Sequence, residues 1–396
     1  MNLQSQIDVL GTPALERVSR LVDCILSDAV LRNASDVHFE PTHAALEIRY
    51  RLDGVLQPAA VLNRDLTPNI IARLKVMSEL LTYRIDVPQE GALGKDHGNW
   101  GAEMRVSTFP IIHGEKAVVR IFPAAIQALD LEQLGIPADL QAALGGLLQE
   151  RTGAVLLTGP SGSGKTTTIY ACLRRLVRLD QGRRHVVTIE DPVEQVIEGV
   201  SQSQARPGTE FDFARGLRSL LRQDPEVIMI GEIRDRETAA TAIEAALTGH
   251  LVFSTLHAGS ACGVVGRLLE MGVEPYLLTS GLKGILNQRL VRKLCPECRQ
   301  PIKGSGGYSQ GQALGCASCA GAGYRGRMLL AELLIPDSPM RQAILNRSDT
   351  SALEAAVQRP DRQTIWTAAD RAIAQGLTTA SEIERVLGPR PEPLAN

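Results

Sequence analysis

The spacing of apolar residues divides the first third of the chain into short elements. Apolar residues recur at helical spacing over Ala14–Leu31, which predicts one amphipathic helix, and a second helix is predicted over Thr67–Leu81. Four stretches alternate as half-buried strands do: 36–41, 45–52, 103–109 and 116–122. The resulting αββαββ order predicts a small α+β domain over residues 1–122.

The middle of the chain follows another pattern, in which wholly apolar strands alternate with helices. The predicted strands are Ala154–Thr158, Val186–Glu190, Val227–Ile230 and Leu251–Thr255, and the predicted helices are Thr167–Arg178, Phe211–Arg222 and Arg236–Leu247. Strands without polar alternation are covered on both faces, so the pattern predicts a mostly parallel sheet between two layers of helices. The expected fold class is therefore α/β over residues 136–290, after a linker over 123–135.

The last quarter of the chain is less regular. A Gly-rich segment with four cysteines occupies residues 291–327, and a strand over Met328–Leu334 with short helices is predicted for residues 328–387. The tail 388–396 is rich in proline, so we expect it to be disordered.

The length, net charge and apolar runs of the chain narrow the kinds of protein that it can be. The 396 residues suffice for two or three domains, and the formal net charge of −2 gives no support for attraction of the whole protein to nucleic acid or anionic membrane. The first residues do not form a signal peptide, and no apolar run approaches the ~20 residues of a membrane span. We therefore expect a cytoplasmic protein without direct membrane insertion.

A phosphate-binding P-loop pattern, Gly159-Pro160-Ser161-Gly162-Ser163-Gly164-Lys165-Thr166, lies between a predicted strand and a predicted helix. Its glycines let backbone N–H groups turn toward phosphate oxygens of ATP. Lys165 is expected to reach the β and γ phosphates, and the Thr166 hydroxyl to bind Mg²⁺. The predicted nucleotide contacts are Gly159, Ser161, Gly162, Ser163, Gly164, Lys165, Thr166 and Thr167. A Gly/Ser-rich surface turn is the weaker alternative, because both flanking elements fit a P-loop.

Polar residues follow other predicted strands at the edge where α/β sheets bind ligands. Glu190 closes one strand, Glu232 follows the next through a glycine, and His257 follows the last. Glu232 is the best candidate for the carboxylate that handles Mg²⁺ or orients the attacking water, although a glutamate at a helix N-terminus also interacts with the helix dipole. His250 precedes the strand that His257 follows, about 20 Å away, so His257 is the candidate at the ligand end.

Four of the seven cysteines form two CxxC pairs, Cys295/Cys298 and Cys316/Cys319, separated by 17 residues. This spacing lies in the range of four-cysteine zinc sites, and four thiolates complete a tetrahedron without an open position. The predicted Zn²⁺ is therefore structural. A redox CxxC is the alternative, which the paired arrangement and the Gly-rich surroundings disfavour.

These motifs resemble the GspE/PilB family of type II secretion and type IV pilus assembly ATPases, from about Leu15 to Leu387. The matching stretches are Ala34–Pro41, Arg49–Gly54, the P-loop, Thr188–Glu194, Leu217–Pro225, Gly231–Asp235 and Thr248–His257. The resemblance implies a PAS-like domain followed by a RecA-like ATPase, assembled as a homohexamer that drives assembly of a pilus or pseudopilus. Its implied partner is a polytopic inner-membrane platform protein, through which the chain would associate peripherally with that membrane.

The resemblance also implies arginines that act across a subunit boundary, where they would stabilise charge on the transferring phosphoryl group. The matching positions are Arg105, Arg120, Arg218 and Arg222. A spacing of four independently places Arg218 and Arg222 on one helix face. For Arg105 and Arg120, the residues by themselves favour a solubilising role on strand surfaces.

Two features depart from the family pattern. About a dozen residues precede the first predicted helix, so docking through the family's additional N-terminal domain is not expected here. Gln89-Glu90-Gly91-Ala92 stands where the family usually has Gln-Asp-Gly-Arg, so that arginine is missing or moved.

Two other functions were compared with a secretion ATPase. A RecA-like nucleic-acid motor is disfavoured, and no nucleic-acid partner is expected, because only 4% of the residues are aromatic and the net charge is near zero. A non-catalytic scaffold is disfavoured by the intact Lys165, Thr166 and Glu232. A competence pilus ATPase remains an alternative within the family.

Overall fold

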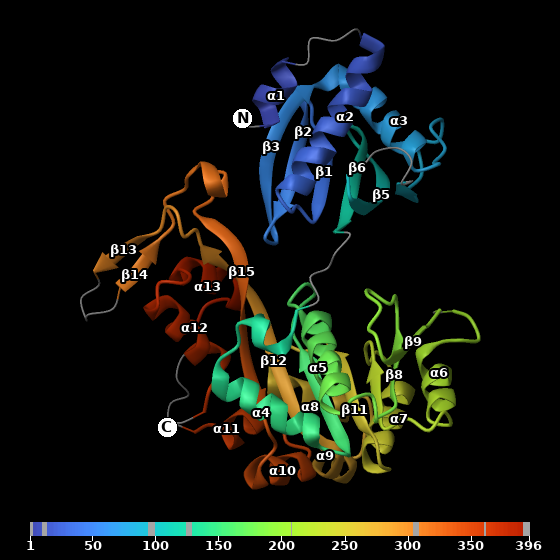
Figure 1. The fold of residues 1–396 in the computed structure, drawn as a ribbon, viewed down its shortest axis with the longest axis vertical. Helices are drawn as coiled ribbons and strands as arrows, with labels where there is room; N and C mark the ends of the chain where they lie inside the picture. Colours follow the sequence, from blue (N-terminus) through green and yellow to red (C-terminus); the bar gives the residue numbers. More distant parts are fainter. Residues whose placement is uncertain are drawn as a thin grey trace. The chain divides into compact units, whose positions relative to one another are not determined.

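The computed structural model describes residues 3–9, 14–93, 100–123, 129–206, 208–303, 309–359 and 362–390. The chain forms two compact units, Met1–Gln127 and Ala128–Asn396 (Figure 1). Residues 124–128 of the predicted linker and residues 391–396 of the predicted disordered tail lie outside the described residues.

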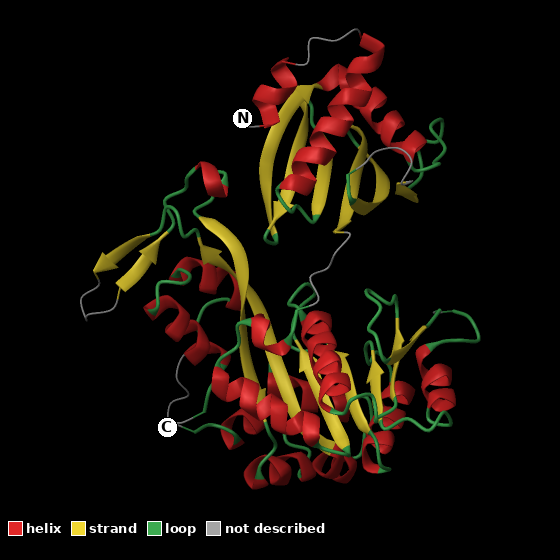
Figure 2. Cartoon of the chain, viewed as in Figure 1, coloured by secondary structure: helices red, strands yellow, loops and turns green. Residues whose placement is uncertain are grey.

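The first unit is an antiparallel sheet of six strands in the order β3-β2-β1-β6-β5-β4. Its strands are β1 (Asp36–Pro41), β2 (Ala45–Leu52), β3 (Val55–Asn63), β4 (Gln89–Leu93), β5 (Ala102–Ile111) and β6 (Gly114–Pro123). Its helices are α1 (Leu3–Val9), α2 (Ala14–Leu31) and α3 (Thr67–Met77), and a 3-10 turn, η1, spans Arg64–Leu66. Apolar side chains of α2 and α3 pack against the sheet in one core, so the predicted α+β domain is confirmed (Figure 2).

The predicted αββαββ order of this unit is wrong, because it omits α1, β3 and β4. Both omitted strands form edges of the sheet. Pro58 interrupts the pattern of β3, and an edge strand tolerates a residue that lacks a backbone N–H. Gly91 lies in β4 where a Cβ atom would be 2.4 Å from the Ser78 carbonyl oxygen, so the strand carries a glycine at its centre. The second predicted helix ends four residues early, and Glu79 beyond it has a φ of 57°.

The second unit contains a sheet of seven strands in the order β15-β12-β7-β11-β10-β8-β9. The strands are β7 (Gly153–Thr158), β8 (Val186–Glu190), β9 (Val200–Gln204), β10 (Val227–Ile230), β11 (Leu251–Leu256), β12 (Leu282–Leu294) and β15 (Tyr324–Leu334). All neighbouring pairs are parallel except β12 and β15. The predicted mostly parallel sheet is therefore confirmed.

Helices cover both faces of this sheet, as the apolar strands predict. In β7, Ala154 and Leu156 belong to one core and Val155 and Leu157 to another, because successive side chains point to opposite faces. The helices are α4 (Ala138–Gln149), α5 (Lys165–Leu179), α6 (Phe213–Leu220), α7 (Arg236–Leu247), α8 (Ala261–Glu270), α9 (Pro275–Gly281), α10 (Ser338–Leu345), α11 (Thr350–Ala356), α12 (Ile365–Ala374) and α13 (Ala380–Leu387). A 3-10 turn, η3 (Leu131–Leu134), precedes α4.

Strands β12 and β15 continue beyond the rest of the sheet toward the cysteine-bearing segment (Figure 1). That segment holds the small hairpin β13 (Gln300–Lys303) and β14 (Ser309–Gln312) and the 3-10 turn η4 (Ala317–Cys319). Side chains of β12 and β15 share a separate small core with α12 and α13. The predicted limits at residues 290 and 327 fall inside β12 and β15, which connect the seven-stranded sheet to the cysteines.

Candidate nucleotide-binding site

The P-loop begins where β7 ends and closes at the first residue of α5. Gly159, Gly162 and Gly164 have φ values of 146°, 73° and 87°, a region that glycine adopts at little cost. A Cβ atom on Gly159 would lie 2.4 Å from the Gln288 carbonyl oxygen and 2.6 Å from Ser163 Oγ. The loop therefore needs glycine at this position for its close approach to β12.

Lys165 projects back over the loop that precedes it. Its Nζ donates hydrogen bonds to the carbonyl oxygens of Gly159, at 2.8 Å, and Pro160, at 3.0 Å. Burial lowers the pKa of the Lys165 ammonium, Glu232 partly offsets this effect, and Arg289 lowers the pKa further. The cation is thus held at the mouth of the loop, close enough to Glu232 and Arg289 to interact with both.

The remaining predicted nucleotide contacts lie in the same loop and the first turn of α5. Ser161 and Gly162 are exposed, and Thr166 and Thr167 are half-buried. The buried Ser163 Oγ has no hydrogen-bond partner among the described residues. An open loop tip at a helix N-terminus, with a lysine folded across it, fits a phosphate group, and Thr166, the predicted magnesium ligand, is the second residue of α5.

Glu232 and His257 come together at the carboxyl edge of the sheet. Glu232 forms an ion pair with Arg234, and His257 Nε2 lies 4.0 Å from Glu232 Oε2. The Glu232 side chain is 16% exposed and that of His257 58%. His250 lies at the opposite end of β11, where its Nδ1 is 3.0 Å from the Ala245 carbonyl oxygen.

Glu190 ends β8 but has a different environment. It is 2% exposed and accepts hydrogen bonds from Tyr170, from Thr188 Oγ1 at 2.5 Å and from Gln202 Nε2 at 3.1 Å. Burial and the Glu190 carboxylate together raise the pKa of Tyr170 well above its usual value, so the phenol stays protonated and donates. Glu190 therefore connects α5, β8 and β9 beneath the edge of the sheet.

The four predicted arginines form two pairs. Arg218 forms an ion pair with Glu237, and Arg222 donates to the Arg218 carbonyl oxygen at 3.0 Å and to Ser219 Oγ at 3.3 Å. In the first unit, Arg105 of β5 and Arg120 of β6 are directly opposite each other in the strand register.

The side chains of Arg105 and Arg120 contact different neighbours. Arg120 Nε donates to Asp36 Oδ1 at 3.1 Å, yet its side chain is 67% exposed. The Arg105 guanidinium lies 5.6 Å from the centre of the Phe122 ring. The two cations therefore stand side by side on the sheet, with one carboxylate beside them.

Strand β12 contributes two residues that the sequence analysis did not single out. Gln288 Nε2 donates to the Ser163 carbonyl oxygen at 2.8 Å, and Arg289 Nη2 donates to the Gly259 carbonyl oxygen at 2.8 Å. The signal in the sequence is a Gln-Arg pair inside a stretch that is otherwise mostly apolar. These residues connect the P-loop with the loop that follows β11.

The four predicted zinc ligands lie together at the ends of β12 and β15. All four sulfur atoms lie within 4.8 Å of one another, and the Cys295–Cys316, Cys298–Cys319 and Cys316–Cys319 sulfur distances are 3.9, 3.8 and 3.8 Å. A tetrahedral zinc ion with Zn–S bonds of about 2.3 Å separates its sulfur ligands by about 3.8 Å, so the residues present fit zinc.

Backbone N–H groups support this cluster. Those of Cys316 and Gly323 each donate to Cys319 Sγ at 3.2 Å. Burial raises the pKa of the Cys319 thiol, but these donors and the neighbouring thiols outweigh it and lower the pKa to about 7. Cys319 is thus stabilised as a thiolate, which is the form that binds metal, whereas burial raises the pKa of the neighbouring Cys298 thiol.

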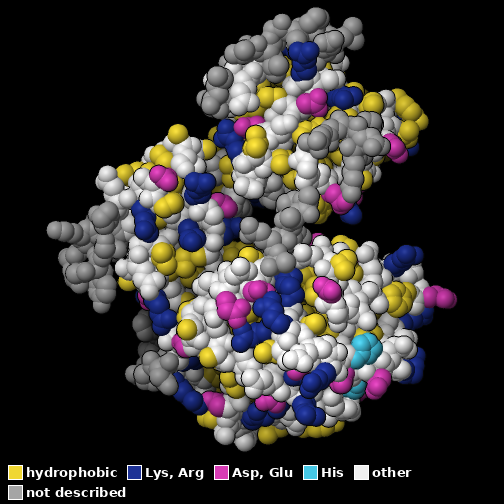
Figure 3. Space-filling model, viewed as in Figure 1, with side chains coloured by type: hydrophobic (Ala, Val, Ile, Leu, Met, Phe, Trp, Pro, Cys, Tyr) yellow, Lys and Arg dark blue, Asp and Glu magenta, His cyan; other side chains and the backbone are white. Residues whose placement is uncertain are grey.

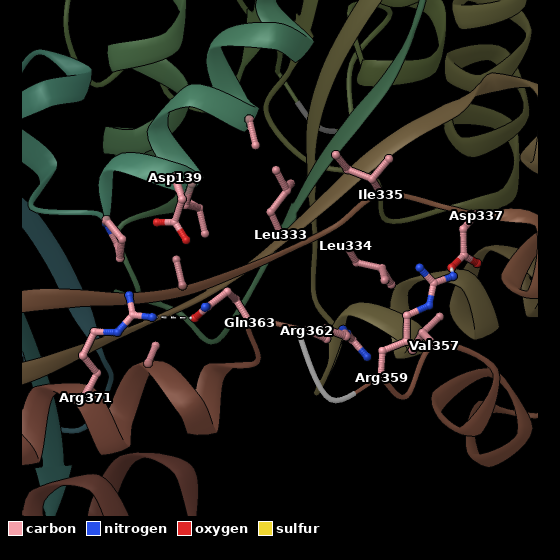
Figure 4. A pocket seen from close by; sticks show the side chains of 15 residues that line it. Asp139, Leu333, Leu334, Ile335, Asp337, Val357, Arg359, Arg362, Gln363 and Arg371 are labelled. Atoms are coloured by element: carbon pink, nitrogen blue, oxygen red, sulfur yellow. Dashed lines mark hydrogen bonds and ion pairs between the residues drawn. The ribbon is translucent and has the colours of Figure 1, made fainter.

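A cavity of about 280 Å³ lies elsewhere in the second unit, and none of the predicted site residues lines it. Its walls include Asp139 and Leu140 of α4, Leu333 and Leu334 of β15, and the arginines Arg359, Arg362 and Arg371 (Figure 4). Arg359 pairs with Asp337 and Arg371 bonds Gln363, so neighbouring groups already partner two of these cations.

The surface charge and the composition of the helices bear on two other kinds of site, a charged binding surface and a membrane span. On the face drawn in Figure 3, acidic side chains lie among the Lys and Arg side chains, as the net charge of −2 leads one to expect. Each helix in the described part of the chain is too short or too polar to cross a membrane.

Comparison with known proteins gives a consistent picture. The family described as type II/IV secretion system protein matches residues 13–385. The chain is 42% identical over 391 residues to a putative type II secretion system protein E of Escherichia coli (strain K12), covering 96% of this chain and 78% of the relative. It is 40% identical over 391 residues to the type II secretion system ATPase E of Vibrio cholerae serotype O1, covering 96% and 77%.

Solved structures are similar in fold. The crystal structure of the pilus retraction motor PilT with bound ADP matches with a TM-score of 0.58 and 28% identity, over 93% of this chain and 97% of that chain. The Legionella pneumophila ATPase DotB matches in fold with a TM-score of 0.67 and 23% identity, over 93% and 95%.

Proposed function

Because the chain belongs to the type II/IV secretion system protein family, it is a secretion ATPase that hydrolyses ATP, and we propose that it works as a homohexameric motor for assembly of a pilus or pseudopilus. The observation that carries this proposal is the arrangement of Lys165, Glu232 and His257 around the P-loop. In the absence of covalent chemistry by the protein, phosphoryl transfer depends on positioning and charge, which this arrangement supplies.

Each residue of the site has a proposed task. The P-loop N–H groups and Lys165 would bind the phosphates, and Thr166 would hold Mg²⁺, which would supply positive charge beside the phosphate oxygens when bound. Glu232 orients the attacking water, and His257, 4.0 Å away, faces the same region. Glu190 lies beneath this edge and keeps Tyr170 and Gln202 in place.

The four cysteines have a structural task in this proposal. Zinc bound by Cys295, Cys298, Cys316 and Cys319 would join the ends of β12 and β15, far along the strands from the P-loop. Since all four positions of a tetrahedral ion are then occupied by the protein, the metal supplies folding energy and no chemistry.

The partner of this motor is proposed from the names of its relatives, which are components of type II secretion systems. We propose that the chain acts at the cytoplasmic side of the inner membrane, against a polytopic platform protein. Type IV pilus and competence systems are the alternatives for the same activity, and the pilus motor PilT is a structural neighbour.

The test combines hydrolysis with assembly. The purified chain is expected to hydrolyse ATP in a Mg²⁺-dependent manner, and its gene is expected to restore secretion or piliation in a strain that lacks it. Lys165→Ala should fail in both assays. Stimulation of the rate by single-stranded DNA, together with normal secretion and piliation in the deletion strain, would instead indicate a nucleic-acid motor.

A further inference from the structure

We propose that Arg289 senses the γ-phosphate of ATP in its own chain, exchanging its bond to the Gly259 carbonyl for the phosphate and so changing the loop that carries His257. This inference rests on the proposed ATPase function. It adds a further cation to the nucleotide site, supplied by β12, beyond Lys165 and the arginines that a neighbouring subunit would contribute.

The position of Arg289 follows from the pairing of β12 with β7. Asn287 of β12 is opposite Thr158, the last residue before the P-loop. A Cβ atom on Gly159 would lie 3.2 Å from Arg289 Nη1, so the guanidinium borders the first glycine of the loop. Lys165 Nζ bonds the carbonyl oxygen of the same glycine. The two cations therefore lie beside the same residue of the loop, Gly159.

Among the described residues, the hydrogen-bond acceptors of Arg289 are all neutral. Nη1 donates to Asn287 Oδ1 at 2.7 Å and to the Gln288 carbonyl oxygen at 3.0 Å, and Nη2 donates to Gly259. Within the described ranges no carboxylate lies within ion-pair distance of it. The nearby Glu332 carboxylate accepts instead from Asn287 Nδ2 and from the Ile365 backbone N–H, each at 2.9 Å.

This environment favours an incoming anion. Arg289 is half-buried, and burial lowers the pKa of its guanidinium. Hydrogen bonds between a guanidinium and a charged oxygen are roughly twice as strong as those to neutral oxygens, and a planar guanidinium can bind phosphate through two of them. A γ-phosphate next to Gly159 therefore competes well with the neutral Gly259 carbonyl oxygen.

Because Arg289 bonds the Gly259 carbonyl oxygen, its transfer to a phosphate would change the loop that contains Gly259. Gly259 lies between His257 and Ser260, which caps α8 by accepting a hydrogen bond from the Gly263 N–H at 3.1 Å. Thr158 Oγ1 attaches the same loop at Ala258 through two hydrogen bonds of 3.0 Å. When Arg289 releases Gly259, Thr158 still holds Ala258, so the change is confined to the segment that begins at Gly259, two residues after His257, and leads into α8.

The experiment compares binding of ATPγS and ADP, by titration calorimetry, in four proteins: the unchanged chain, Arg289→Gln, Arg289→Lys and the control Arg267→Gln. Arg267 is an exposed arginine on α8 that pairs with Glu270, so the control removes the same charge away from the site. Loss of a hydrogen bond between charged groups should weaken ATPγS binding by roughly ten- to a hundredfold in Arg289→Gln. ADP binding should change by less than about twofold, since its γ-phosphate is missing.

Hydrogen exchange gives a second measurement that does not depend on turnover. In the unchanged chain and in Arg267→Gln, ATPγS should alter exchange of the 258–263 amides relative to ADP, and in Arg289→Gln this difference should vanish. If Arg289→Gln does not fold, Arg289→Lys, which keeps the charge but loses the fork, should show a smaller loss of the same γ-phosphate selectivity.

Three outcomes would overturn the inference. They are equal weakening of ATPγS and ADP, unchanged binding of both, and a nucleotide-dependent exchange difference that persists in Arg289→Gln. If the unchanged chain bound neither nucleotide, the proposed ATPase function itself would fail, and this result is distinct from the three above.

Discussion

Two glutamates at the carboxyl ends of adjacent strands, Glu190 and Glu232, have different environments. Glu190 is enclosed by three hydrogen-bond donors, whereas Glu232 faces an arginine, a histidine and the P-loop lysine. A carboxylate that must orient water needs access to the site, and a fully bonded buried one is better suited to holding other side chains. We therefore propose that the chemistry at this edge centres on Glu232.

Replacing Glu232 with glutamine tests this assignment. Glutamine keeps the shape and removes the charge, so we expect ATP binding to persist while turnover falls by about two orders of magnitude or more. Lys165→Ala should weaken nucleotide binding itself. Steady-state hydrolysis and equilibrium binding of ATPγS separate the two effects. Hydrolysis at the unchanged rate in the glutamine variant would reassign Glu232 to interaction with the helix dipole.

Residues of the site differ in how well the sequence reveals them. The P-loop is contiguous because one turn of backbone must surround the phosphates, so the sequence alone predicts it. Gln288 is 125 positions away from Ser163, with which it bonds, and this contact exists only because β12 pairs with β7. Neither periodicity nor spacing contains that pairing, which depends on tertiary packing.

The same distinction applies to whole elements. Helix α2 and strands β1, β2, β8 and β10 have the predicted bounds, since one face or both faces of each pack in a core. Strand β12 escaped prediction because polar residues interrupt its apolar pattern. The structure pairs these side chains with the P-loop, with Glu332 and with Glu382, so they are compatible with a central strand.

The four clustered cysteines predict that folding of the segment around them depends on bound zinc. Freshly reduced protein should contain about one zinc per chain, and Cys298→Ser should lose it and unfold the segment 293–327, because metal affinity and local folding are linked. Metal analysis and hydrogen exchange measure the two effects. Cys24→Ser, which changes a thiol in the other unit, should keep its zinc. Absence of zinc from the unchanged protein would contradict the assignment.

The ion pair between Glu382 of α13 and Arg292 of β12 predicts that the stability of the fold depends on pH. Glu382 has a fully buried side chain that accepts from Arg292 Nη2 at 2.7 Å and from Arg385 Nη2 at 2.6 Å. Burial raises the pKa of this carboxyl, but Arg385 and Arg292 outweigh burial and lower the pKa from 4.5 to about 2. The stabilisation is therefore complete above about pH 4.5 and is lost as the pH falls toward 2.

Glu382→Gln should accordingly reduce the free energy of unfolding by roughly 3 kcal/mol at pH 7, with a deficit that shrinks at acidic pH. Urea unfolding at pH 7, 5, 4 and 3 measures this trend. Glu384→Gln, an exposed glutamate on the same helix, serves as the control and should change stability little. A deficit that stays constant down to pH 3 would show that the contact depends on shape and not on charge.

At the scale of the whole molecule, the proposed chemistry is divided between the two units. The P-loop and Glu232 belong to the second unit, while Arg105 and Arg120 lie in the first. Asp36 holds Arg120 through Nε and also lies 3.5 Å from Arg51 Nε, so a row of cations shares one carboxylate. Such a row attracts a further anion, and the proposed hexamer would supply one as the nucleotide of a neighbouring chain.

If Arg105 or Arg120 completes the site of a neighbour, a lone chain should be nearly inert. Specific activity should then rise with protein concentration to a plateau. A mixture of Arg120→Ala, which has an intact P-loop, with Lys165→Ala, which has an intact Arg120, should regain activity at interfaces where the two intact parts meet. An arginine that contacts the transferring phosphoryl group is worth about 10³ or more in rate, which leaves ample range to detect the recovery. A rate strictly proportional to concentration, down to dilutions where sedimentation shows only monomer, together with no recovery on mixing, would exclude a shared site.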